Sequence, residues 1–328
     1  MSSLTSTSTT TNSTAPGTTG TGRLPRLPQP FKGMTWLVWR QHRAAFWTIL
    51  GASALAVAYI VFQRSQLHTA GYDSTSTGLR LMPILLGVFL GAPLFAGDLE
   101  NGTAKLVVTQ SVSRTRWLTT KLALTALVVV VSTVALSVGF GWWWNLYDES
   151  TGSEWTSGPI FNNTGPVPVA LALFSVFGGV AIGVVLRRTL VAMVVTLGFT
   201  VVVQIAWSHF LAHFLLSLAN VVTITTNNGV SFQHVMPTLP PGAHQVNWSN
   251  PPYITGDGKL LGWSTCNEAQ TEQAHDLCMK KADVVGWSVD YLPVSQMNGL
   301  QWFGASILLV LTATVTVFLF FWGRKRLA

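Results

Sequence analysis

The chain has 328 residues, of which 49% are hydrophobic and only 9% are charged, and it contains 14 Trp and 17 Phe. A soluble domain carries about 25% charged residues, so this composition excludes an ordinary soluble domain and indicates a protein of the lipid bilayer. The net charge of +7 comes from basic residues in short clusters beside apolar runs, and this scatter argues against binding of nucleic acid.

The N-terminal 30 residues are rich in Ser, Thr, Gly and Pro and contain no apolar run. They are expected to form a disordered cytoplasmic tail, not a signal peptide. Residues 31–43 then combine aromatic and basic side chains, among them Trp36, Trp39 and Arg40. This mixture favours a short N-terminal interfacial helix in the headgroup region. The alternative is that these residues only flank the first span.

Six apolar stretches follow, and none of them contains Asp, Glu, Lys or Arg. Each approaches or reaches the roughly 20 residues that a transmembrane helix needs. The predicted fold is an all-α integral membrane protein of six transmembrane helices within residues 31–328, with a long extracellular segment, 209–302, between the fifth and sixth spans. The predicted spans are residues 45–62, 81–97, 122–142, 167–186, 189–208 and 303–322.

The positions of the basic residues orient these spans. If the N-terminal tail is cytoplasmic, 14 of the 19 Lys and Arg residues fall on the cytoplasmic side, whereas the two short outer loops carry only Arg64 and Arg80. Cytoplasmic loops carry an excess of Lys and Arg, and long loops count little in this comparison. We therefore expect a multi-pass protein of the plasma membrane with both termini in the cytoplasm.

The same orientation places the stretch from Gly97 to Lys121, between the second and third spans, in the cytoplasm. It carries acidic and basic residues along its length, so all of it is expected to be aqueous. Asn101 and Gly102 can end the helix that arrives from the membrane, and Thr103 can cap a new short helix over residues 104–109. This pattern suits docking on a partner in the water phase.

The outer segment contains the only two cysteines of the chain. Residues 267–283 are expected to be helical, with Cys266 just before this helix and Cys278 within it. An oxidising space favours a disulfide between them. Bonded cysteines need Cα atoms within roughly 7 Å, so Cys266 would have to lie on a turn or strand that folds back. The alternative is two unpaired, small apolar side chains.

Some residues inside the spans have two interpretations. Gln204 is the most polar residue deep in a span, and it either contacts a substrate on a transport pathway or makes an interhelical hydrogen bond. Small residues four apart let helices approach closely, either within one subunit or across a dimer. These are the pairs Gly87 with Gly91 and Gly179 with Gly183.

Several kinds of chemistry have no sequence support. His209 and His213 are four apart, but no carboxylate or third His lies near them, so no metal site is expected. The chain has no GxxxxGK[ST], HExxH or GxSxG motif, which argues against ATP binding and against an enzyme. No ionisable residue is predicted in mid-membrane, so a proton-coupled transporter is disfavoured and the energy would come from elsewhere.

The loop between the second and third spans resembles the first cytoplasmic loop of ABC-2 type transporter permeases. The residues that carry this resemblance are ENGT at 100–103, TQSVSR at 109–114, and then Trp117, Leu118 and Lys121. In that family an E-x-G-T turn precedes a short helix, a P-x-S-R-like turn and a Lys that opens the third span, and Ser111 here stands where Pro is often found. The spans, termini and long outer segment also match, and residues 291–302 are similar to the approach to the last span in actinobacterial members.

The resemblance implies a dimer of permeases with two ATPase subunits docked beneath, and a pathway at the dimer interface lined largely by the first, second and fifth spans. ATP would bind to the ATPase, so no cofactor is expected on this chain. Leu106 and Val107 would offer an apolar face, and Arg114 and Arg116 would pair with acidic residues of the partner or remain solvated. The residues expected to couple the loop to the ATPase are Asp98, Glu100, Gly102, Thr103, Leu106, Val107, Arg114 and Arg116.

Three functions follow from these observations. The leading hypothesis is the permease subunit of an ATP-driven exporter, working as a homodimer or paired permease on a small apolar or amphipathic substrate. The second is a membrane-anchored sensing or binding protein that acts through its extracellular segment. The third is an intramembrane enzyme, which is the weakest because no polar catalytic cluster faces the membrane core.

The basic-residue count makes a direct prediction about topology. Reporter fusions after Arg64 and Glu154 should report from the outside, and fusions after Arg188 and Ala328 from the inside. The measurement is a pair of reporters that are active on opposite sides of the membrane. A signal from the inside at Glu154 would contradict the six-span arrangement.

Overall fold

The computed structural model describes residues 34–65, 71–102, 114–151, 154–226, 238–247, 250–269 and 271–326. The structure is mostly helical, and within these ranges six helical stretches are long and apolar enough to cross a membrane. The predicted six-span, multi-pass membrane protein is therefore confirmed.

The spans run as follows. The first is α1 (Met34–Ser65), and the second combines α2 (Tyr72–Leu86), the π-helical turn η1 (Gly87–Gly91) and α3 (Pro93–Glu100). The third is α5 (Arg114–Thr151) and the fourth is α7 (Val167–Leu186). The fifth is α8 (Thr189–Phe210), continued by η2 (Leu211–Leu215) and η3 (Leu216–Leu218), and the sixth is α10 (Met297–Arg326).

Only the fourth span keeps its predicted bounds, and the others extend past the charge-free stretches. Residues 34–43 are the first turns of α1. The predicted short interfacial helix before the first span is therefore not a separate helix in the structure. Arg80 lies within α2 instead of in an outer loop, and the fifth span continues to Leu218, beyond its predicted end at residue 208. Helical hydrogen bonding continues past the last apolar residues of a span. A prediction that ends each span at the nearest charged residue therefore makes the helix too short.

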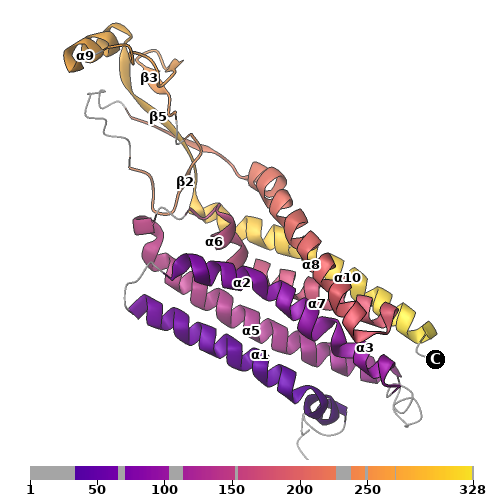
Figure 1. The fold of residues 1–328 in the computed structure, drawn as a ribbon. Coiled ribbons are helices and arrows are strands. Elements are labelled where there is room, and N and C mark those ends of the chain that lie inside the picture. The colour runs from indigo at the N-terminus through magenta and orange to yellow at the C-terminus, as the bar shows by residue number, and fades with distance from the viewer. Residues whose placement is uncertain are drawn as a thin grey trace, which may run out of the picture.

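The helices lie side by side, with a small sheet beyond one end of the bundle (Figure 1). The other end holds the start of α1, the end of α3, the start of α5 and the C-terminal end of α10 (Figure 1). We call these the sheet end and the loop end. A tight turn at Arg187 and Arg188 joins α7 to α8 at the loop end, with Arg187 in the left-handed conformation at a φ of 56°.

Glycines bring the second and fourth spans into close contact. A Cβ added at Gly91 would lie 2.4 Å from the carbonyl oxygen of Val176, and one at Gly183 would lie 2.4 Å from that of Ala92. At Gly179 it would lie 2.6 Å from the carbonyl oxygen of Gly87. These small residues therefore serve packing within one subunit, the first of the two interpretations above.

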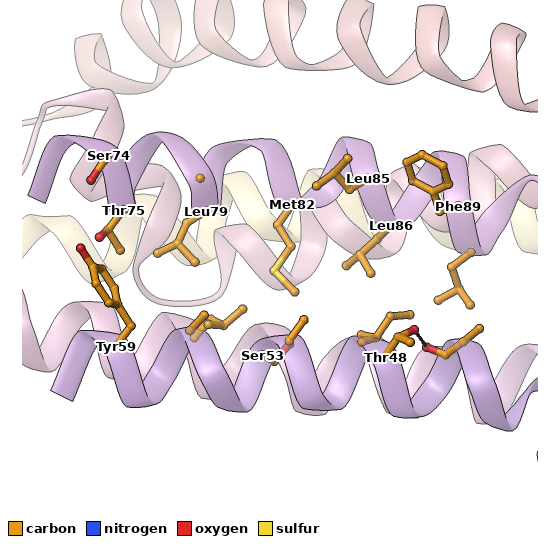
Figure 2. A pocket seen from close by; sticks show the side chains of 17 residues that line it. Thr48, Ser53, Tyr59, Ser74, Thr75, Leu79, Met82, Leu85, Leu86 and Phe89 are labelled. Carbon is orange, nitrogen blue, oxygen red and sulfur yellow. Dashed lines mark hydrogen bonds between the residues drawn. The ribbon is translucent and has the colours of Figure 1, made fainter. Parts of the chain in front are cut away.

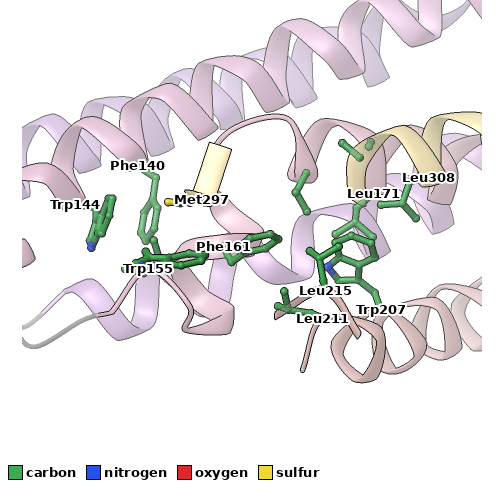
Figure 3. Packing of buried hydrophobic residues seen from close by; sticks show 14 of the residues in the cluster. Phe140, Trp144, Trp155, Phe161, Leu171, Trp207, Leu211, Leu215, Met297 and Leu308 are labelled. Carbon is green, nitrogen blue, oxygen red and sulfur yellow. The ribbon is translucent and has the colours of Figure 1, made fainter. Parts of the chain in front are cut away.

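A core of aromatic and aliphatic side chains fills the sheet end of the bundle (Figure 3). It joins α5, the turn after it, α6 (Gly158–Asn163), α7, η2 and α10. Trp155 is fully buried there, and its indole N–H donates to the carbonyl oxygen of Leu292, 3.1 Å away. The His244 imidazole and the Glu154 carboxylate form a second contact between the sheet and this turn. The core thus anchors the outer segment to the third span.

The outer segment contains strands, so the all-α prediction is wrong for this part of the chain. Within the described residues, five strands form an antiparallel sheet in the order β1-β5-β3-β4, with β2 also paired to β5. β5 is rich in β-branched and aromatic residues, which is the composition of a strand. The other four strands are too short to show a recognisable alternation of apolar and polar residues. The strands are β1 (Val222–Thr225), β2 (His244–Gln245), β3 (Tyr253–Thr255), β4 (Leu260–Leu261) and β5 (Val284–Leu292).

The helix predicted at 267–283 is shorter in the structure, where α9 covers Glu272–Lys281 and Thr271 accepts a capping hydrogen bond from the backbone N–H of Ala274. Cys266 precedes this helix on a turn, with a φ of 71°. The turn folds the chain back, which brings the Cα atoms of Cys266 and Cys278 to 5.8 Å, and the two side chains form a disulfide. It ties α9 to the turn after β4.

Replacing both cysteines, as in Cys266→Ser with Cys278→Ser, should destabilise the outer segment. The bond closes a loop of 12 residues, and loss of that constraint on the unfolded chain costs about 3 kcal/mol. Peptide mapping of the non-reduced protein by mass spectrometry should recover the two cysteine peptides as one linked species. Alkylation of both thiols without a prior reduction step would contradict the bond.

Candidate functional site

An ion pair lies buried at the loop end, between the two arms of the loop. The ammonium group of Lys121, on α5, contacts the carboxylate of Asp98, on α3. Lys121 has no exposed surface, and its Nζ atom lies 4.8 Å from the ring centroid of Phe95 and 5.4 Å from that of Trp117. Gln41, on α1, donates from Nε2 to the Asp98 Oδ1 atom at 2.8 Å. We call Gln41, Asp98 and Lys121 the junction.

The junction links the first three spans through residues that are 57 and 23 positions apart in sequence. Phe95 and Trp117 pack edge to face beside it, with centroids 5.1 Å apart, and shield it from water. The expectation that every charge of residues 97–121 is aqueous is therefore wrong for this pair. Asp98 and Lys121 leave water together because each supplies the opposite charge to the other, and Gln41 adds a hydrogen bond to the carboxylate.

Glu100 holds the end of the second span against the start of the fifth. Its Oε2 atom accepts a hydrogen bond from the backbone N–H of Thr189, the first residue of α8, at 2.9 Å. The N-terminus of a helix has unpaired N–H groups and a partial positive charge, so a carboxylate is favoured there. The E-x-G-T resemblance puts Glu100 in the turn before the short loop helix, whereas the structure places its carboxylate at the start of α8.

The remaining predicted coupling residues separate into two groups. Gly102 has a φ of 71°, a left-handed conformation that side chains with a Cβ resist, and Arg116 is exposed on the first turn of α5. Thr103, Leu106 and Val107 lie outside the described residues, as does the side chain of Arg114. Gln41 was not predicted from the sequence, because its partner Asp98 is 57 residues away and no local pattern marks the contact.

A groove of about 760 Å³ separates the first span from the second (Figure 2). It lies between α1 on one side and α2 with η1 on the other, and α1 packs mainly on α5. Its walls are apolar apart from five hydroxyl-bearing side chains, and none of the residues that line it is charged. The hydroxyl groups belong to Thr48, Ser53, Tyr59, Ser74 and Thr75.

Gln204, the residue proposed for a pathway, is not among those that line this groove. Its Nε2 atom lies 3.4 Å from the backbone carbonyl oxygen of Arg80 and donates to it, which links α8 to α2. The contact is an interhelical hydrogen bond, the second of the two interpretations given above for this residue. The rings of His209 and His213 stack on each other, with centroids 5.8 Å apart.

Comparison with known proteins agrees with this architecture. A family model described as "ABC-2 membrane transporter related" matches residues 56–212, from the second half of the first span to η2. The match includes the loop and the second to fifth spans, and it supports an ABC-2 type permease, so the predicted family is confirmed. No curated protein and no solved structure matches the chain.

Breaking the junction from one side should destabilise the fold strongly. Asp98→Asn and Lys121→Met each leave a charge buried without its opposite charge, which costs about 3–5 kcal/mol. The double variant removes both charges, so its loss should be smaller than the sum of the single losses. The measurement is the free energy of unfolding of the purified protein in mixed micelles.

The matched control is Arg80→Met, which removes an exposed cation from α2 and should change stability by no more than about 0.5 kcal/mol. Losses that simply add in the double variant would show that Asp98 and Lys121 do not act as a pair.

Proposed function

We propose that this chain, an ABC-2 type permease by its family match, is the membrane subunit of an ATP-driven exporter. It moves a small apolar or amphipathic substrate out of the cell and is driven through residues 97–121 by a separate ATPase. The observation that carries the proposal is the junction, because it connects both arms of that loop to the two spans that border the groove.

Three contacts support a coupling role for the loop. Asp98 belongs to the second span and Gln41 to the first, so a displacement of α3 acts on α1 directly. Lys121 extends the same connection to α5, which packs along α1. Glu100 connects the end of α3 to the start of the fifth span. A partner that pushes on the loop would therefore move the first, second, third and fifth spans together.

The energy source is proposed to be ATP bound to the partner. The sequence has no phosphate-binding loop, and permeases of the ABC-2 family are membrane transport subunits that normally work with an ABC ATPase. Basic residues gather at the loop end, where Arg40, Arg116, Arg187 and Arg188 lie. Because cytoplasmic loops are rich in Lys and Arg, this end with both termini is proposed to face the cytoplasm.

A second copy or a related permease would complete the transporter. α8 presents a wide apolar face, on which Leu190 is 79% exposed and Val194 is 71% exposed. Such a face suits lipid or another permease subunit. We favour a pair of permeases with their loop ends side by side above two ATPase subunits, as the family resemblance implies.

The alternative function, a membrane-anchored sensing or binding protein, has one observation in its favour. The outer segment has its own core of Tyr253, Met279, Trp287 and Val289, and a disulfide braces it. A folded outer segment of this kind is suited to recognition of an external ligand. Co-purification of an ATPase from detergent extracts distinguishes the two functions, because a sensor of this kind requires no such partner.

Two substitutions in the loop should uncouple transport while leaving the protein in the membrane. Gly102→Val forces a Cβ into a left-handed backbone conformation, and Glu100→Ala removes the acceptor for the Thr189 N–H group. In proteoliposomes with the ATPase, both variants should lose substrate stimulation of ATP hydrolysis and substrate transport.

The matched controls are Gly97→Ala and Glu100→Gln. A Cβ at Gly97 meets only the Thr189 hydroxyl oxygen at 3.9 Å, an ordinary contact, and Gln keeps an acceptor for the Thr189 N–H group. Both controls should keep most of the stimulation. Unchanged complex formation and unchanged hydrolysis in Gly102→Val and Glu100→Ala would show that the loop is only a linker.

A further inference from the structure

The groove between α1 and α2 has a polar end and an apolar end (Figure 2). Tyr59, Ser74 and Thr75 lie together toward the sheet end, whereas Phe89 lies toward the loop end. Phe89 lies 14 positions after Thr75, which corresponds to about 21 Å of helix. The groove is therefore long enough for an extended apolar chain with a polar head at one end.

The polar end offers both kinds of hydrogen-bonding group. The hydroxyls of Ser74 and Thr75 donate to the carbonyl oxygen of Gly71, at 3.0 and 2.7 Å, so their oxygen lone pairs remain as acceptors. The Tyr59 hydroxyl accepts a hydrogen bond from Gln63 at 3.0 Å, and its own proton has no acceptor within the described ranges. The end thus presents two acceptors and one donor.

Ser53 supplies an independent observation from the middle of the groove. It is only 5% exposed, and its hydroxyl oxygen has no hydrogen-bond partner in the described part of the chain. A buried hydroxyl without a partner costs free energy, so a partner from outside the chain would stabilise this arrangement. Its place in the wall of the groove indicates an occupant with a polar atom in reach.

The absence of charge from the lining limits the occupant further. None of the residues that line the groove is Asp, Glu, Lys, Arg or His. A charged head group would leave water without an opposite charge in these walls, which is strongly unfavourable. A neutral head with a hydroxyl or amide matches the donor and the acceptors instead.

We propose that the groove binds an uncharged amphiphile, with a hydroxyl- or amide-bearing polar part that extends from Tyr59, Ser74 and Thr75 to Ser53, and an apolar chain that continues toward Phe89. The inference deepens the proposed function, since it names the substrate class of the exporter. Binding itself needs neither the ATPase nor ATP, so it is tested separately from transport.

The test uses the full-length protein in nanodiscs and a monoacylglycerol with a photoreactive group in its acyl chain. Labelling should fall on peptides of α1 and α2. Gly78 lines the groove and has no atom within 4 Å of an added Cβ, so Gly78→Leu should fill the space and abolish labelling. Gly51, on α1, is equally open but does not line the groove, so Gly51→Leu should label like the unmodified protein.

The head-group contacts are tested in the same assay. Tyr59→Phe and Thr75→Val each remove one hydroxyl with little change of shape, and each should weaken binding by about 3- to 10-fold. A long-chain alcohol should compete with the probe, whereas a fatty acid or an alkylamine of the same chain length should compete poorly. Probe delivered in the bilayer and probe added from solution distinguish a lipid from a dissolved compound as the natural source.

Two results would overturn the proposal. One is labelling of α1 and α2 that persists in Gly78→Leu or is competed equally by charged amphiphiles. The other is the absence of labelling together with cross-linking between two copies of a Leu79→Cys variant, which would show that a helix of a second copy fills the groove. If labelling behaves as expected while ATP-driven transport is absent, the binding site stands and the exporter function fails.

Discussion

The buried ion pair between Asp98 and Lys121 is the constraint on which the arrangement of the loop end depends. Two opposite charges removed from water must stay together, since separating them leaves each without compensation in a medium of low polarity. Their contact fixes the end of α3 against the start of α5, and the hydrogen bond from Gln41 adds α1. These contacts tie the ends of three spans together at the loop end, and none of the three residues lines the groove.

Two pairs of spans are closely packed beside the junction. α1 lies along α5, and the second span lies along α7, where Gly91 and Gly183 allow backbone contact. The groove separates the first pair from the second at α1 and α2. A change in the distance between α1 and α2 changes the width of this groove. Under the function proposed above, a push on the loop would act on the groove through the junction.

The sequence was sufficient for the six spans because their apolar content is unambiguous, and the fourth matched fully because Pro166 and the Arg187–Arg188 turn mark its ends. Other features depended on distant contacts. Gln41 meets Asp98 across 57 residues, and the partner of Glu100 is 89 residues away. The sheet was missed because most of its strands are two to four residues long and depend on pairing with β5. Local patterns carry no information about such pairings.

Coupling between the junction and the groove is tested most directly by the distance between spin labels on the two sides of the groove. Leu55 on α1 and Thr77 on α2 are both exposed and do not line the groove, so labels there leave it intact. With the ATPase bound, the distance should differ between the nucleotide-free and ATP-trapped states, and the difference should be lost in Asp98→Asn. An identical distance distribution in both states of the unsubstituted protein would contradict coupling through the junction.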